Sequence, residues 1–311
     1  MKLKISRKVI QIIGSIIGFV LLGYQIWKGF SSININIINN FNIWMICLSL
    51  LFAFLALIFQ ILGWLIINRS IGYYLPFSKI IFGYTFTFLP RYIPGSIWGY
   101  LTRSEWLLRE FKMPYQHSLF ISFLEMGGIF LVNLLLGTYF LNSSTRKTLV
   151  ILILLLTLLL LITFKYLLPN FSTTEKYTVL FLKMNFLSWL IVVNLFIISW
   201  IFYGIGLMFT LETFGVNLLF NLSTILLITS INSISWLIGF VIFFVPAGIG
   251  IRELILNSLL VNTFLIPEGI SSSIAVSNRI ISLFAEVSLL LISFLIFRKS
   301  EEKLITTNYK K

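Results

Sequence analysis

Long apolar runs recur along this chain, and the polar residues gather between them. A helix needs roughly 20 residues to cross the hydrocarbon of a bilayer, and eight of the runs are about that long. They predict spanning helices at 9–29, 43–67, 118–141, 148–168, 186–211, 223–244, 249–266 and 272–297. The pattern therefore predicts an all-α fold, a polytopic helical bundle in a membrane.

The apolar and aromatic segment 75–115 does not fit a single span. It is interrupted by Pro76, Pro90, Pro94 and Pro114 as well as by charged residues. Proline breaks a helix, and backbone left unpaired at membrane depth has to be buried in protein or line a wet cavity. We expect a re-entrant pair of short helices on the cytoplasmic side.

Composition agrees with a membrane protein. Hydrophobic residues make up 59% of the chain and charged residues 11%, and the mean hydropathy is +1.01. So little polar surface excludes a water-soluble globule. The net charge of +13 does not indicate nucleic acid as a partner, because no soluble basic domain is present to bind it. Membrane lipids are the expected partners.

The basic residues predict the orientation. The stretches 30–42, 212–222 and 267–271 contain no Lys or Arg. Lys and Arg favour the cytoplasmic side, so these stretches are expected outside and both termini inside, with 301–311 as a short basic tail. Only Arg146 and Lys147 depart from this arrangement. We expect a multi-pass protein of the cell (plasma) membrane.

Two similar motifs indicate an internal two-fold repeat, with halves at 1–168 and 183–300. Each motif has Pro, Gly and Gly, followed by Arg and Glu. They occupy 88–105 and 244–253. Four predicted spans lie between them, so both motifs are expected to open on the same face, as in a parallel repeat. The alternative is a chance match of Pro and Gly residues.

The second motif contains Pro246, Gly248, Gly250, Arg252 and Glu253, at the predicted start of a helix. Glycines let backbone approach a bound group, and a helix N-terminus with an arginine in its first turn suits a phosphate. The alternative is a simple interfacial break. Arg252 then extends toward the lipid head groups, and Glu253 is favoured by the helix dipole.

The first motif offers the same chemistry through Arg91, Pro94, Gly95, Gly99 and Arg103. Its aromatic neighbours are also typical of anchors at the membrane interface. Both motifs are therefore candidate substrate-binding segments.

Three ionisable residues fall inside predicted spans, where charge is costly and usually faces a partner or a cavity. They are Glu125, Arg279 and Glu286. A role in gating is one interpretation. A structural ion pair between Arg279 and Glu286, or between helices, is the other.

The residues that metal sites and hydrolases need are scarce. The chain has no aspartate, one histidine (His117) and one cysteine (Cys47). We expect no metal site, no cofactor and no nucleophilic triad, which argues against an enzyme.

Together with Glu125–Gly128 and Asn278–Arg279, the two motifs resemble the membrane region of the lysylphosphatidylglycerol synthases, a flippase-like domain. The resemblance covers most of the chain and implies one flippase-like transmembrane domain over 1–311. It implies movement of a lipid with an anionic or modified head. Ala247 stands where a second glycine is common in the family. Aminoacyl transfer is not implied, because that activity belongs to a separate soluble domain.

Three functions remain open at this point. The first is a lipid flippase or translocase that handles a phosphate-bearing lipid. The second is an accessory subunit that presents a polyprenyl-phosphate or glycolipid to a partner enzyme, such as a separate glycosyltransferase. The third is an intramembrane transferase.

Overall fold

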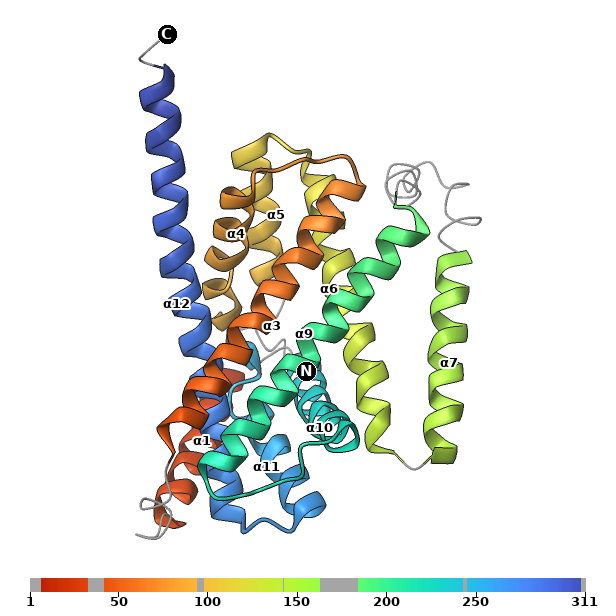
Figure 1. Ribbon diagram of the computed structural model, residues 1–311, viewed down its shortest axis with the longest axis vertical. Helices are drawn as coiled ribbons and strands as arrows, with labels where there is room; N and C mark the ends of the chain where they lie inside the picture. The colour runs from red at the N-terminus through yellow and green to blue at the C-terminus, as the bar shows by residue number, and fades with distance from the viewer. Residues whose placement is uncertain are drawn as a thin grey trace, which may run out of the picture.

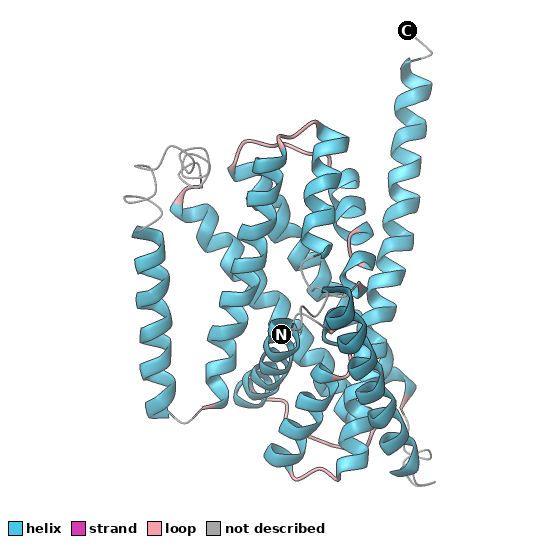
Figure 2. Ribbon diagram, turned by 180° about the vertical axis from the view of Figure 1, so that it is seen from behind, coloured by secondary structure: helices cyan, strands magenta, loops and turns pink. Residues whose placement is uncertain are grey.

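The computed structural model describes residues 7–32, 42–93, 98–141, 143–162, 184–242 and 245–308. Within these ranges the chain forms ten α-helices, three short 3₁₀ helices and no strand (Figures 1 and 2). The α-helices are α1 (Arg7–Ser32), α3 (Ile43–Ser70), α4 (Phe77–Phe86), α5 (Trp98–Phe111), α6 (Tyr115–Gly137), α7 (Ser143–Ile162), α9 (Phe186–Thr213), α10 (Leu222–Val241), α11 (Ile251–Phe264) and α12 (Glu268–Asn308). The 3₁₀ helices are η1 (Leu89–Tyr92), η2 (Thr138–Phe140) and η5 (Pro246–Gly248).

Five described segments are long and apolar enough to cross a bilayer. They are Ile43–Ser70, Tyr115–Phe140, Phe186–Thr213, Leu222–Val241 and Glu268–Ser300. They coincide with five of the eight predicted spans, which confirms an all-α multi-pass membrane protein. The spans at 9–29 and 148–168 include side chains outside the described set and stay predictions, although α1 and α7 form helices there.

Asparagine residues set the starts of three of these helices. Asn42, Asn185 and Asn221 precede α3, α9 and α10, and each side chain accepts a hydrogen bond from a backbone N–H of the first turn. The donor–acceptor distances are 3.0, 2.8 and 2.9 Å. These bonds satisfy N–H groups that have no partner within the helix.

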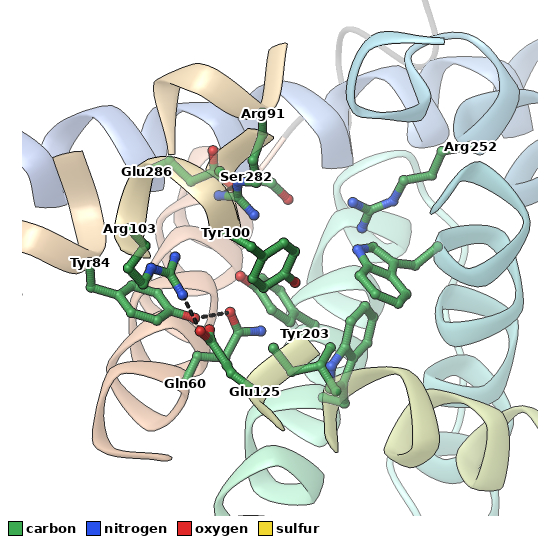
Figure 3. Close-up of a pocket in the computed structure, with 14 residues that line it drawn as sticks. Gln60, Tyr84, Arg91, Tyr100, Arg103, Glu125, Tyr203, Arg252, Ser282 and Glu286 are labelled. Atoms are coloured by element: carbon green, nitrogen blue, oxygen red, sulfur yellow. Dashed lines mark hydrogen bonds and ion pairs between the residues drawn. The ribbon is translucent and has the colours of Figure 1, made fainter. Parts of the chain in front are cut away.

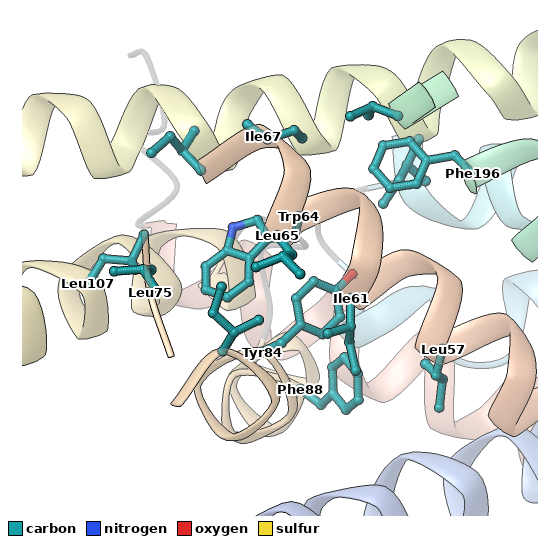
Figure 4. Packing of buried hydrophobic residues seen from close by; sticks show 14 of the residues in the cluster. Leu57, Ile61, Trp64, Leu65, Ile67, Leu75, Tyr84, Phe88, Leu107 and Phe196 are labelled. Atoms are coloured by element: carbon teal, nitrogen blue, oxygen red, sulfur yellow. The ribbon is translucent and has the colours of Figure 1, made fainter. Parts of the chain in front are cut away.

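The main apolar core lies where α3 packs closely along α9. A Cβ atom at Gly63 would lie 2.3 Å from the ring of Phe196, so this glycine lets the two helices approach. Trp64, Tyr84 and Phe88 continue the core toward α4 (Figure 4). Tyr84 belongs both to this core and to the polar centre described below.

Two segments turn back inside the bundle. We call residues 77–111 hairpin A; it contains α4, η1 and α5, which matches the broken pair of helices predicted within 75–115. Lys79 and Glu110 form an ion pair that joins its two outer ends. We call residues 222–264 hairpin B; it contains α10, η5 and α11. Gly239, near the end of α10, packs on Gly248 at the tip of hairpin B.

The long helix α12 shows how the hairpins are oriented. Successive residues of α4 and η1 contact positions of α12 that lie closer and closer to its middle. Successive residues of α11 then contact positions from the middle of α12 toward its N-terminus. The contacts join Ser78 to Ser300, Thr85 to Ser293, Tyr92 to Glu286, Glu253 to Arg279 and Asn257 to Ser271. Hairpin A therefore enters from one end of the bundle and hairpin B from the other, and their tips meet in the middle (Figure 1).

This arrangement corrects two predictions. The segment 249–266 is not a span, because α11 has only 14 residues and begins in the interior of the bundle. At about 1.5 Å per residue it reaches roughly 20 Å, short of the hydrocarbon thickness. The two motifs also approach from opposite ends rather than opening on one face. The reason is that α10, although long and apolar enough to cross a bilayer, ends at Val241 beside η5 and does not cross the whole bundle.

The fold predicts that the loops at the two outer ends face opposite sides of the membrane. Tyr74 precedes hairpin A and Leu219 precedes hairpin B, and both side chains are largely exposed. In a Cys47→Ser background, we expect cysteine at only one of these two positions to react with an impermeant thiol reagent in intact cells. After permeabilisation both react. Labelling of both positions in intact cells would contradict the opposed hairpins.

Candidate functional site

The tips of hairpins A and B enclose a polar cavity in the middle of the bundle. It has two adjoining parts with volumes of about 50 and 60 Å³, which is room for several water molecules. The residues that line both parts are Arg91, Tyr100, Trp236, Arg252 and Glu286. Figure 3 shows the arrangement, with Arg103 and Glu125 at one end, Arg252 at the other and two tyrosines between them.

Arg103 and Glu125 form a fully buried ion pair that joins α5 to α6. The Nε atom of Arg103 donates to Thr87 Oγ1 at 3.0 Å. The guanidinium also lies over the ring of Tyr84, 3.8 Å from its centroid. A cation over an aromatic ring is stabilised by the ring quadrupole, so Arg103 has three kinds of partner in a site that excludes bulk water.

Arg91, at the tip of hairpin A, pairs with Glu286 of α12. Its Nη2 atom lies 3.1 Å from Glu286 Oε1. The hydroxyl of Tyr92 donates to the other carboxylate oxygen at 3.0 Å. The side chain of Arg91 crosses Gly99, where a Cβ atom would lie 2.5 Å from its Cγ atom. Gly99 therefore gives this arginine room beside α5.

Glu253 joins the tip of hairpin B to α12. Its Oε2 atom accepts a hydrogen bond from the backbone N–H of Gly250 at 2.5 Å, and its Oε1 atom lies 3.5 Å from Arg279 Nε. Arg279 also donates to the backbone oxygen of Ala247 at 3.3 Å. The N-terminus of α11 therefore binds the chain's own carboxylate, at the place where the sequence suggested an external anion.

Arg252 differs from the other three arginines, because it forms no ion pair with any carboxylate in the described parts of the chain. Its nearest polar side-chain partner is the amide oxygen of Asn232, at 3.5 Å. The cluster thus contains four arginines and three glutamates, counted from these three ion pairs and Arg252. Its formal surplus of one positive charge lies on a side chain that lines both parts of the cavity.

Apart from Gly99, which lines the cavity beside Arg91, the predicted site residues fall into three groups. Seven of them form the charge cluster: Arg91, Arg103, Glu125, Arg252, Glu253, Arg279 and Glu286. Arg279 pairs with Glu253 rather than with Glu286. Glu286 lies about two helical turns further along α12, beside η1. Pro94 and Gly95 lie outside the described residues.

Pro246, Gly248 and Gly250 shape the tip of hairpin B. Gly248 has a φ of +66° and Gly250 a φ of +81°. A Cβ atom at Gly248 would lie 2.8 Å from Gly239 O, and one at Gly250 would lie 2.3 Å from Gly18 O. Both glycines therefore allow close packing against α10 and α1, with backbone angles that other residues rarely adopt.

Several further cavity residues were not predicted. Four of them, each with a polar side-chain atom, are Gln60, Trp200, Tyr203 and Trp236. The aromatic three lie in apolar runs, where nothing in the sequence separates them from core residues. Gln60 is a polar residue inside the span Ile43–Ser70, so it carried the same kind of signal as Glu125.

Comparison with protein-family models and with curated proteins finds no match to this chain. The assignment of a function therefore rests on the chemistry of the site and on the resemblance of its motifs.

The buried ion pair of Arg103 and Glu125 predicts that replacing Glu125 destabilises the protein much more than replacing Glu105. Glu125→Gln leaves Arg103 buried without a countercharge, which costs about 3–5 kcal/mol of unfolding free energy. Glu105→Gln is the matched control, because Glu105 forms an exposed pair with Arg109 on the same helix, and such pairs contribute about 1 kcal/mol or less. Unfolding of the purified variants in detergent measures both. Equal stability of Glu125→Gln and the wild type would contradict the assignment.

Proposed function

We propose that this protein is a lipid flippase or translocase that binds a phosphate-bearing lipid head between the tips of hairpins A and B. The observation that carries the proposal is Arg252, a partly buried arginine in a cavity at the centre of the bundle, with no carboxylate partner among the described residues. An arginine in such a setting favours an anion, and its planar guanidinium matches two phosphate oxygens at once.

The arrangement of the hairpins supports transport in particular. Helices that are interrupted near the middle of a membrane, and that meet there from opposite ends, are typical of transporters that alternate access to a central site. Here hairpins A and B supply each of the four arginines or its partner. In the proposed cycle the polar head enters this centre while the acyl chains stay in the surrounding lipid.

The charges at the two ends support an orientation. Lys79, Arg109 and Lys112 lie at the outer end of hairpin A, which is the end where α12 leaves the bundle. Since cytoplasmic loops are enriched in Lys and Arg, we propose that hairpin A opens toward the cytoplasm of the cell and hairpin B toward the outside.

Replacement of Arg252 tests the proposal. With the pure protein in vesicles and an acyl-labelled phosphatidylglycerol, we expect Arg252→Ala to slow transbilayer movement about tenfold or more, because a charge-assisted hydrogen bond is lost. Arg252→Lys retains the charge but lacks the planar guanidinium that can bind two phosphate oxygens at once, so we expect partial activity. Movement is read as loss of label fluorescence on addition of an external quencher.

Arg109→Ala is the matched control, because Arg109 is an exposed arginine paired on its own helix. It is expected to move lipid at the wild-type rate. Arg252→Ala with wild-type transport would overturn the assignment of the anion site. No movement by the wild-type protein would overturn the proposed function.

A further inference from the structure

The part of the cavity that reaches Glu125 is lined by hydrogen-bonding atoms that the ion pairs do not use. Glu125 is bound to Arg103 through one carboxylate oxygen, and its other oxygen has no hydrogen-bond partner within the described structure. The indole Nε1 of Trp200 also has none. Both side chains are almost completely buried, and both residues line the same part of the cavity. Buried polar atoms are nearly always paired, so these two indicate a ligand group.

The two atoms have complementary chemistry. Glu125 offers an acceptor and Trp200 a donor, whereas a hydroxyl group both donates and accepts. Tyr100 and Tyr203 lie between Glu125 and Arg252 (Figure 3), and their rings give apolar faces for the carbon skeleton of a bound head. This part of the cavity therefore suits a neutral group that carries hydroxyls.

The charges argue against a cationic head. Each of the three glutamates of the cluster is already within an ion pair with an arginine, and Arg252 adds a fourth positive charge. An ammonium group, as in ethanolamine, would meet a surplus of positive charge and find no carboxylate free of an arginine in the cluster. Such a group is disfavoured by like-charge repulsion and by the cost of its burial.

We propose that the cavity selects a phosphodiester whose head is a polyol or a sugar, with the phosphate at Arg252 and hydroxyls of the head at Glu125 and Trp200. This inference rests on the proposed function for the place of the phosphate, and it names the substrate class.

Binding of matched lipids tests the selectivity without requiring transport. The full chain in detergent is titrated calorimetrically with short-chain phosphatidylglycerol, phosphatidylethanol and phosphatidylethanolamine. The first two carry the same single negative charge and differ in the hydroxyls. We expect phosphatidylglycerol to bind with a Kd about tenfold lower than phosphatidylethanol, and phosphatidylethanolamine to bind more weakly than both. Equal affinities, or a preference for the ethanolamine head, would overturn the inference.

Binding of a water-soluble ester distinguishes a site for a lipid from a site for a free phosphate ester. Glycerol 3-phosphate offers the same hydroxyls and a phosphate without acyl chains. We expect it to bind at least about tenfold more weakly than phosphatidylglycerol, because the apolar contacts of the chains are missing. Equal affinity would show that the site serves a soluble ester and would overturn the lipid assignment.

Trp200→Phe removes the indole donor and keeps an aromatic ring. We expect the preference for phosphatidylglycerol over phosphatidylethanol to fall from about tenfold to near equality. Trp44→Phe is the control, because Trp44 is exposed at the start of α3, away from the cavity, and it is expected to retain the preference. An unchanged preference in Trp200→Phe would overturn the place of the hydroxyl. If that variant does not fold, the wild-type lipid series decides by itself.

The vesicle assay keeps the two proposals apart. Selective binding of phosphatidylglycerol without transbilayer movement would retain the substrate class and overturn transport. Movement of all three lipids with no selectivity in binding would retain transport and overturn the substrate class.

Discussion

The balance of charge at the centre of the bundle is the constraint on which this structure depends. Four arginines are held in the interior of a protein whose outer surface is largely apolar, and a buried charge without compensation is costly. Three glutamates, two of them outside the hairpins on α6 and α12, meet three of these charges. The tips of hairpins A and B are thereby tied to the long helices, and Arg252 is left as the charge that a ligand can compensate.

These ion pairs also indicate how the centre could change shape. α12 contacts both hairpins, through Glu286 to Arg91 on one side and through Arg279 to Glu253 on the other. A movement of either hairpin relative to α12 therefore has to exchange or stretch an ion pair. An anion beside Arg252 would alter the electrostatic balance of both pairs, which links binding of the head to the position of the tips.

Much of the fold follows from the sequence, because long apolar runs allow few structures in a membrane. The span at 186–211, for example, matches α9, and the prolines of 75–115 mark hairpin A. The ionisable residues of the site also stood out, since charge is rare in such runs. The pairing of Arg279 with Glu253 did not, because it depends on a tertiary contact between α11 and α12. The short α11 was missed because its apolar run continues beyond the helix to Ile266.

The aromatic residues of the cavity could not be predicted for a related reason. Trp200 and Trp236 lie in helices whose other faces meet the core or lipid, and periodicity alone does not show which face meets a cavity. Only the packing of α9 against α10, where the centroids of the two tryptophan rings lie 5.3 Å apart, shows that both residues belong to the polar centre.

The central claim is that the surplus charge of Arg252, rather than its bulk, binds the head. Asn232→Asp tests this most directly, because it places a carboxylate beside Arg252, where the amide oxygen now lies at 3.5 Å. The account predicts that binding of phosphatidylglycerol falls about tenfold or more while the protein stays as stable as the wild type or becomes more stable. Asn232→Ala controls for loss of the amide and is expected to bind the lipid more tightly than Asn232→Asp. Wild-type affinity in Asn232→Asp would contradict the account.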